Sequence, residues 1–163
     1  MAYNNPGNFD VDSIPIQPNN PRYTALLVSD DNVTGDGTAY PIIFPTTTVN
    51  VGSHYSTTTG ILTVPFSGVY AGFVLLAMGG FTSSHVDMTI QSVSTVTGTT
   101  TLWKGNPWAL ADSSTNLTVP IGLVNKLTAA EEVYLALTVS GGAQVIDMIS
   151  LSIWDNNLLY RTA

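Results

Sequence analysis

The sequence contains no cysteine and only four positively charged residues. Without cysteine, neither a disulfide framework nor a thiolate metal site can form. The four cationic residues stand against eleven carboxylates, which gives a formal net charge of −7. Binding to nucleic acid needs a basic surface that displaces counterions from phosphates, and this sequence carries no basic stripe. We therefore expect no nucleic-acid partner.

Long hydrophobic runs are missing as well. The longest apolar stretch, residues 69–78, has about half the length that a membrane-spanning helix needs. We therefore expect no membrane partner. The first ten residues, MAYNNPGNFD, have neither the basic nor the apolar segment of a secretory signal peptide. For this reason we expect the chain to be assembled in the cytoplasm of the cell that makes it.

Thr, Ser, Val, Gly and Asn are abundant, whereas charged residues make up only 9% of the chain. This composition suits pleated strands better than helices, whose exposed faces usually carry Glu and Lys. A chain of 163 residues is long enough for one domain with a proper core. We expect one all-β domain over residues 23–163.

Residues 1–22 differ from the rest and are expected to form an extended N-terminal arm. Four prolines exclude a regular helix there and favour an extended backbone: Pro6, Pro15, Pro18 and Pro21. Two alternating apolar pairs, Phe9 with Val11 and Ile14 with Ile16, could lay one face of the arm against a neighbouring surface. We interpret the arm as a docking element; a disordered tail is the alternative.

Strand signals recur along the rest of the chain at the spacing of a β-sandwich. Strands are expected at residues 23–29, 61–66, 69–78, 85–93, 117–121, 133–139 and 149–153. Between them, residues 97–101 are interpreted as a polar turn and residues 103–108 as a loop. Pro120 indicates an edge strand or a bulge. Eight to ten strands in two antiparallel sheets, with no long helix, predict a jelly-roll sandwich.

The stretch at 69–78 is apolar on both faces. Strand alternation puts one set of side chains on one face, namely Val69, Ala71, Phe73, Leu75 and Ala77, and the other set opposite, namely Tyr70, Val74, Leu76 and Met78. An antiparallel strand with one wet face should alternate apolar with polar residues. This strand therefore needs a second buried surface, which could belong to another subunit.

The same region carries a family resemblance. The motif residues, in order, are Phe44, Asn50, Gly52, Tyr55, Thr59-Gly60, Leu62-Thr63-Val64-Pro65, Gly68, Tyr70 and Phe73. Their order and spacing resemble the signature of the C1q/TNF-like jelly-roll head. Upstream, the loop at residues 32–38, NVTGDGT, resembles that of C1q-like domains in bacteria and their phages. The resemblance implies a homotrimer, and we expect Tyr70, Val74, Leu76 and Met78 to lie near its three-fold axis.

Two binding sites were considered beside this assembly. Asp30, Asp31 and Asp36 could offer oxygen ligands to calcium, which some C1q-like heads bind, but their spacing does not match an EF-hand loop. Aspartates in turns usually bond their own backbone, so no metal site is expected. Trp103 and Trp108 could stack on a sugar of a host surface glycan, whereas a core or interface role is the alternative.

No catalytic pattern stands out. The two histidines, His54 and His85, lack the spacing of metal ligands and are interpreted as structural or surface residues. The sequence shows no phosphate-binding glycine loop, catalytic carboxylate pair or nucleophile elbow. We therefore expect neither an enzyme nor a cofactor.

The resemblance to phage and bacterial members leads to a functional hypothesis. We expect a virion structural protein: a trimeric capsid decoration, or cement, protein on the outer surface of a phage head, with the major capsid protein as its partner. Three arms would attach one trimer multivalently. Two alternatives stay open, namely the receptor- or glycan-binding head of a phage tail or fibre protein, and a bacterial extracellular C1q-like adhesion module.

Overall fold

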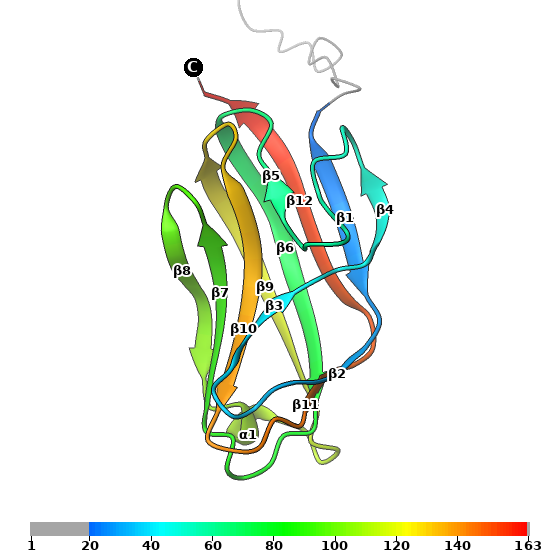
Figure 1. Ribbon diagram of the computed structural model, residues 1–163, viewed down its shortest axis with the longest axis vertical. Coiled ribbons are helices and arrows are strands. Elements are labelled where there is room, and N and C mark those ends of the chain that lie inside the picture. Colours follow the sequence, from blue (N-terminus) through cyan, green and yellow to red (C-terminus); the bar gives the residue numbers. More distant parts are fainter. Residues whose placement is uncertain (1–19, 163) are drawn as a thin grey trace, which may run out of the picture.

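The computed structural model describes residues 20–162, which form two antiparallel sheets packed face to face (Figure 1). This confirms the all-β jelly-roll sandwich predicted from the sequence. The arm residues Phe9, Val11, Ile14 and Ile16 lie outside the described residues.

The larger sheet has seven strands. They are β1 (Arg22–Leu27), β2 (Asp30–Thr34), β4 (Thr46–Asn50), β6 (Gly68–Gly79), β9 (Leu117–Leu127), β11 (Ile146–Met148) and β12 (Ser152–Arg161). Strand β6 is central, because β9 pairs with one of its sides while β12 and the short β11 share the other. β1 and β4 continue the sheet beyond β12, so that β9 and β4 are its long edges.

The smaller sheet has five strands: β3 (Ala39–Ile42), β5 (Leu62–Thr63), β7 (Asp87–Ser94), β8 (Gly98–Gly105) and β10 (Glu132–Ser140). β10 pairs with β7 on one side and with β3 and β5 on the other. Within residues 20–162, β8 pairs only with β7 and forms a free edge. The edges β8 and β9 lie on the same side of the sandwich (Figure 1).

Most predicted strands are present, but four expectations were wrong. The strand predicted at 149–153 begins only at Ser152, where β12 starts, because Ser150 has a positive φ of 54° that interrupts extended backbone. Residues 97–101, predicted as a turn, and Trp103 of the predicted loop belong largely to strand β8, because an edge strand tolerates exposed threonines and threonine favours extended backbone. The rest of that loop contains a one-turn helix, α1 (Pro107–Leu110), capped by the Asn106 side chain. Of the predicted strand at 61–66, only the two residues of β5 are paired.

The core lies between the inner faces of the sheets, and its largest fully buried side chain is Trp154 of β12. Its indole meets the ring of Tyr23 edge-on at 5.1 Å and that of Tyr55 at 5.7 Å, and these two tyrosines stack on each other at 5.1 Å. Phe44 approaches the same indole at 6.1 Å. The edge-to-face contacts stabilise the fold in addition to the burial of these large apolar side chains. The cluster therefore links β1 and β12 to the segment between β4 and β5, which contains Tyr55.

The two ends of the sandwich differ in what they carry. Residue 20, the first that the structure describes, lies at the same end as the C-terminus, and α1 lies at the opposite end (Figure 1). The arm-bearing end is fixed by the Asn20 side chain, which donates to the carbonyl oxygen of Leu158 at 2.6 Å. The backbone N–H of Leu158 in turn donates to the carbonyl oxygen of Pro21. The start of the domain is therefore bonded to β12.

Candidate assembly surface

The residues that the sequence assigned to a trimer axis lie inside the subunit. Tyr70 is 3% exposed, and Val74, Leu76 and Met78 are fully buried between the two sheets of one chain. A side chain in the core of its own subunit has no surface left for a partner, so this assignment was wrong. The hydroxyl of Tyr70 donates to the carbonyl oxygen of Phe66 at 2.9 Å, which ties the strand to the preceding loop.

Most of the opposite face of β6 remains accessible in the subunit, from Val69 to Leu75, whereas Ala77 on the same face is only 6% exposed. Register places the residues of this sheet face in rows across four strands. One row is Leu26, Ile153, Leu75 and Pro120; the next is Thr24, Asp155, Phe73 and Gly122; the third is Arg22, Asn157, Ala71 and Val124. We call these twelve residues the assembly face. Phe73, on the central strand β6, is 43% exposed, and Val124, on the edge strand β9, is 73% exposed. Neighbouring apolar side chains that are this exposed mark a site of protein–protein contact.

One carboxylate lies within the assembly face and is neutralised by no cation of the described chain. Asp155 accepts hydrogen bonds from the hydroxyl of Thr24 and the amide of Asn157, each at 2.8 Å. Both donors are uncharged, and the one cation among the twelve residues of the assembly face is Arg22 in the next row. The position of the Asp155 carboxylate is set by one hydrogen bond from β1 and one from β12 itself.

The edge of the assembly face is shaped for close approach. Pro120 stands on the edge strand β9, as its sequence predicted, because a proline there removes no hydrogen bond that a central strand would need. Two residues further on, Gly122 leaves open space, since a β-carbon built there would meet no atom within 4 Å. The backbone at Gly122 is therefore open to a partner.

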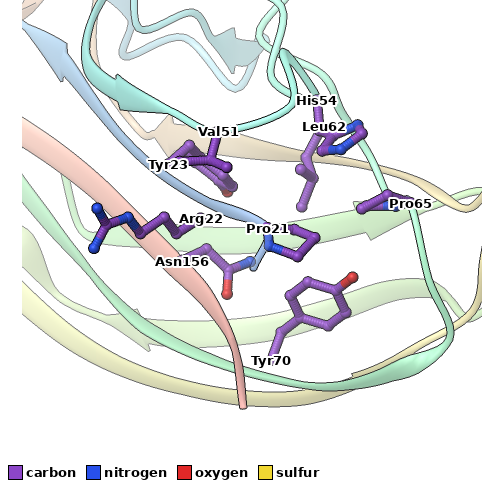
Figure 2. A pocket seen from close by; sticks show the side chains of 9 residues that line it. All are labelled: Pro21, Arg22, Tyr23, Val51, His54, Leu62, Pro65, Tyr70 and Asn156. Atoms are coloured by element: carbon purple, nitrogen blue, oxygen red, sulfur yellow. The ribbon is translucent and has the colours of Figure 1, made fainter. Parts of the chain in front are cut away.

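A small cavity opens near the foot of the arm. It has a volume of about 10 Å³, which is the least that one water molecule needs. Figure 2 shows the nine side chains that line it, Tyr23, Leu62 and Tyr70 among them. The hydroxyl of Tyr23 is buried and has no hydrogen-bond partner within residues 20–162, and burial raises the pKa of that hydroxyl. The cavity is too small to hold a ligand.

The three aspartates considered for calcium are used separately. The carboxylate of Asp30 accepts a hydrogen bond from the hydroxyl of Tyr40 at 2.6 Å; burial and this bond raise the pKa of Tyr40. Asp36 accepts from the backbone N–H of Thr38 at 2.9 Å, which lowers the pKa of its carboxyl. Asp31 is exposed on β2. Within residues 20–162 no three potential ligands come together as a metal site.

The two tryptophans considered for glycan binding do not form one platform. Trp103 lies on β8 directly opposite the buried Ile90 and packs against the core. Trp108 lies on α1 and is 42% exposed, beside the exposed Leu110. Of these two tryptophans, Trp108 is the exposed one, on α1 at the end of the sandwich opposite the C-terminus (Figure 1).

Two buried polar residues were not singled out as sites by the sequence. His85 is fully buried: its Nδ1 accepts from the backbone N–H of Thr82, and its Nε2 donates to the carbonyl oxygen of Ala143, both at 3.0 Å. Glu131 is fully buried and accepts from the hydroxyl of Ser94 and from the backbone N–H of Thr128. Both hold loops together, and neither adjoins a second catalytic group in the described chain.

No helix within residues 20–162 is long and apolar enough to cross a membrane.

Comparisons with known proteins agree with this architecture. The model of the C1q domain matches residues 25–151. In structure the chain is similar to the globular domain of zebrafish complement 1qA protein, with a TM-score of 0.63 and 20% sequence identity over 88% of this chain and 99% of that one. At this identity the similarity concerns the fold. No curated protein matches the sequence.

Proposed function

The chain belongs to the C1q domain family, and we propose that it acts as a homotrimeric structural module whose subunits meet through the assembly face. The C1q domain is a binding and structural module rather than an enzyme, so its function depends on which surfaces meet which partners. The observation that carries the proposal is the apolar assembly face, with Phe73 and Val124 exposed on it.

The chemistry of the assembly face supports an oligomer. In the three rows of the assembly face, every residue of β6 and β9 is apolar or glycine, whereas the polar residues lie on β1 and β12. Monomeric proteins seldom leave such a contiguous apolar patch in water, because its burial gains roughly 25 cal/mol for each Å². In a three-fold arrangement, one patch of each subunit contacts a different patch of the next subunit. Because the ring closes after three subunits, every copy of both patches is buried.

We propose further that the trimer is a decoration protein on the outer surface of a phage head, assembled in the host cytoplasm. Three features support this reading: the 32–38 loop resembles that of phage and bacterial C1q-like domains, the net charge of −7 disfavours contact with packaged DNA, and the arm joins one end of the sandwich. Arms at one end of three subunits would all reach the same underlying lattice of major capsid protein.

Copy number in the particle tests the decoration proposal. Quantitative electrophoresis of purified virions should show this chain at hundreds of copies, as expected for a protein that covers a head. A handful of copies confined to the tail would contradict it and favour receptor binding. Absence from virions, with the protein found on a bacterial surface, would favour an adhesion module.

One observation favours the receptor-binding alternative. Trp108 and Leu110 stay exposed at the end remote from the arm, where an attached head would face the environment. Exposed indoles give flat apolar area on which sugars stack. Replacing Trp108 by alanine should abolish binding of the particle to its host if this alternative holds, and leave it unchanged if the chain only decorates the head.

A further inference from the structure

A groove opens at the free edge of the sandwich, between β7 and β8 of the smaller sheet and the end of β9 in the larger sheet. Its volume is about 170 Å³. We call it the edge groove. It is separate from the assembly face, because it lies between the inner faces of the two sheets, where the core would otherwise continue.

Polar residues replace the core at this place. Along β7 the inner-face side chains are Met88 and Ile90, which are fully buried, and then Ser92. Register confirms the face, because Ser92 stands directly opposite the buried Leu135 of β10. A residue at such a position is normally apolar, since it faces the opposite sheet. The serine keeps the sheets from closing here.

The neighbouring strands contribute polar groups to the same gap. Thr100 of β8 is the cross-strand partner of Ser92, so the two hydroxyls lie on the same face of the sheet. Across the gap, Asn125 of β9 shares the inner face with the buried Leu123 and Leu127. Leu102 completes the lining with an apolar wall.

Some polar groups of this lining are already hydrogen-bonded within the protein, whereas others are available to a ligand. The hydroxyl of Ser94 donates to the buried carboxylate of Glu131 and accepts from the backbone N–H groups of Val96 and Thr97, both at 3.0 Å. This network makes the groove floor rigid. By contrast, the side chains of Ser92, Thr100 and Asn125 form no hydrogen bond with another residue in the described part of the chain. Two hydroxyls and an amide thus face the groove with both donors and acceptors available.

The groove offers no charge at its centre. Glu131 is fully buried behind Ser94 and has its own donors. Lys126 borders the groove, but it follows Asn125 on the strand, so alternation directs its side chain to the opposite face of β9. An ionised ligand would leave its charge unpaired among neutral groups, which is costly.

We propose that the edge groove binds an uncharged polyhydroxylated ligand of the size of one sugar ring. Each water needs roughly 10 to 15 Å³ of such space, so the groove of about 170 Å³ holds about a dozen waters. Pockets for drug-sized ligands measure about 300 to 1,000 Å³. A sugar ring can replace those waters while reproducing their bonds to Ser92, Thr100 and Asn125, and its C–H face can rest on Leu102 and Leu127. This inference does not depend on the trimer or on the virion.

Saturation-transfer NMR on the full-length protein tests the proposal with three probes: the methyl glycosides of D-glucose, D-galactose and N-acetyl-D-glucosamine. At least one should bind saturably with a Kd on the order of 1 mM, as expected for one small ligand with a few hydrogen bonds. Thr100→Val should weaken that binding at least about fivefold, since it removes one hydroxyl from the lining. Thr101→Val is the matched control, because Thr101 lies opposite Gln91 and does not line the groove.

A second variant covers the case in which Thr100→Val disturbs the edge strand. Ser92→Ala removes the other hydroxyl without adding volume and should weaken binding to a similar extent, while light scattering and thermal unfolding stay as in the unmodified protein. The proposal is overturned if none of the three probes binds below about 50 mM, if Thr100→Val and Thr101→Val bind alike, or if Trp108→Ala alone abolishes binding.

Discussion

Phe73 of β6 is the direct cross-strand partner of Gly122 of β9, and the space where a β-carbon of Gly122 would stand is empty. An aromatic side chain that is 43% exposed thus stands beside bare backbone on the same face of the sheet. In a trimer this pair would present a protruding side chain next to backbone that is open to a partner. The pairing makes Gly122 as informative for assembly as Phe73.

Substitutions at Gly122 should separate subunit stability from assembly. Gly122→Ala should stabilise the isolated subunit by about 0.5 to 1 kcal/mol, because glycine in a strand interior is entropically costly and the added β-carbon meets no atom. Gly122→Glu should leave the subunit folded but weaken the trimer. Denaturant unfolding and analytical ultracentrifugation measure the two effects.

Gly72 provides the contrast. A β-carbon on Gly72 would collide with the carbonyl oxygen of Asp155 on the neighbouring strand, so Gly72→Ala should destabilise the subunit itself. If the Gly72 and Gly122 variants behaved alike, the distinction drawn here between core and assembly face would be mistaken.

His85 should be required for the loops at the arm-remote end. His85→Phe keeps an aromatic ring but leaves the Thr82 N–H and the Ala143 carbonyl without their partner, at a cost of about 1 to 3 kcal/mol for each buried group left unpaired. Hydrogen exchange should accelerate around residues 82 and 143. His54→Phe is the matched control and should change the free energy of unfolding little, because His54 is only half-buried. Equal effects of the two variants would contradict this role.

Tyrosine ionisation should report the buried aromatic cluster. Burial raises the pKa of Tyr55 to about 12, although the Phe44 N–H that donates to its hydroxyl at 3.0 Å lowers it. Because the folded state holds this proton more tightly than the unfolded chain, whose tyrosines titrate near pH 10, the stabilising effect is complete below about pH 10 and is lost as the pH rises towards 12. Absorbance at high pH should show fewer tyrosinates in the native protein than in denaturant. Identical titration curves would contradict the burial.

The arm should be dispensable for the fold. Deleting residues 2–19 retains Asn20 and Pro21, whose bonds to Leu158 hold the start of β1. The truncated protein should therefore keep its thermal unfolding temperature within a few degrees and its oligomeric state, while losing attachment to phage heads. Loss of the folded state would show instead that Phe9, Val11, Ile14 and Ile16 belong to the core of the domain.

The sequence predicted the sandwich well because its strands alternate and its turns carry glycine, aspartate and asparagine. It also predicted that β6 must bury two faces, but it could not tell the core face from the assembly face, since Tyr70, Val74 and Leu76 are as apolar as Ala71, Phe73 and Leu75. Only the packing of the second sheet decides this. The edge groove was missed for a related reason. Ser92 and Thr100 lie in stretches rich in serine and threonine, where the sequence does not show which side chains face inward. Only the register between β7 and β8 shows that the two are cross-strand partners.

The central claim, assembly through the face that carries Phe73, is tested most directly by multi-angle light scattering of the unmodified protein, Phe73→Glu and Val86→Glu. Val86 is also an exposed apolar residue, 53% accessible, but it lies outside the assembly face. The account predicts a mass of three times 17.3 kDa for the unmodified protein and Val86→Glu, and a mass of one folded chain for Phe73→Glu. A monomeric unmodified protein at micromolar concentration, or a Phe73→Glu variant that remains a trimer, would contradict it.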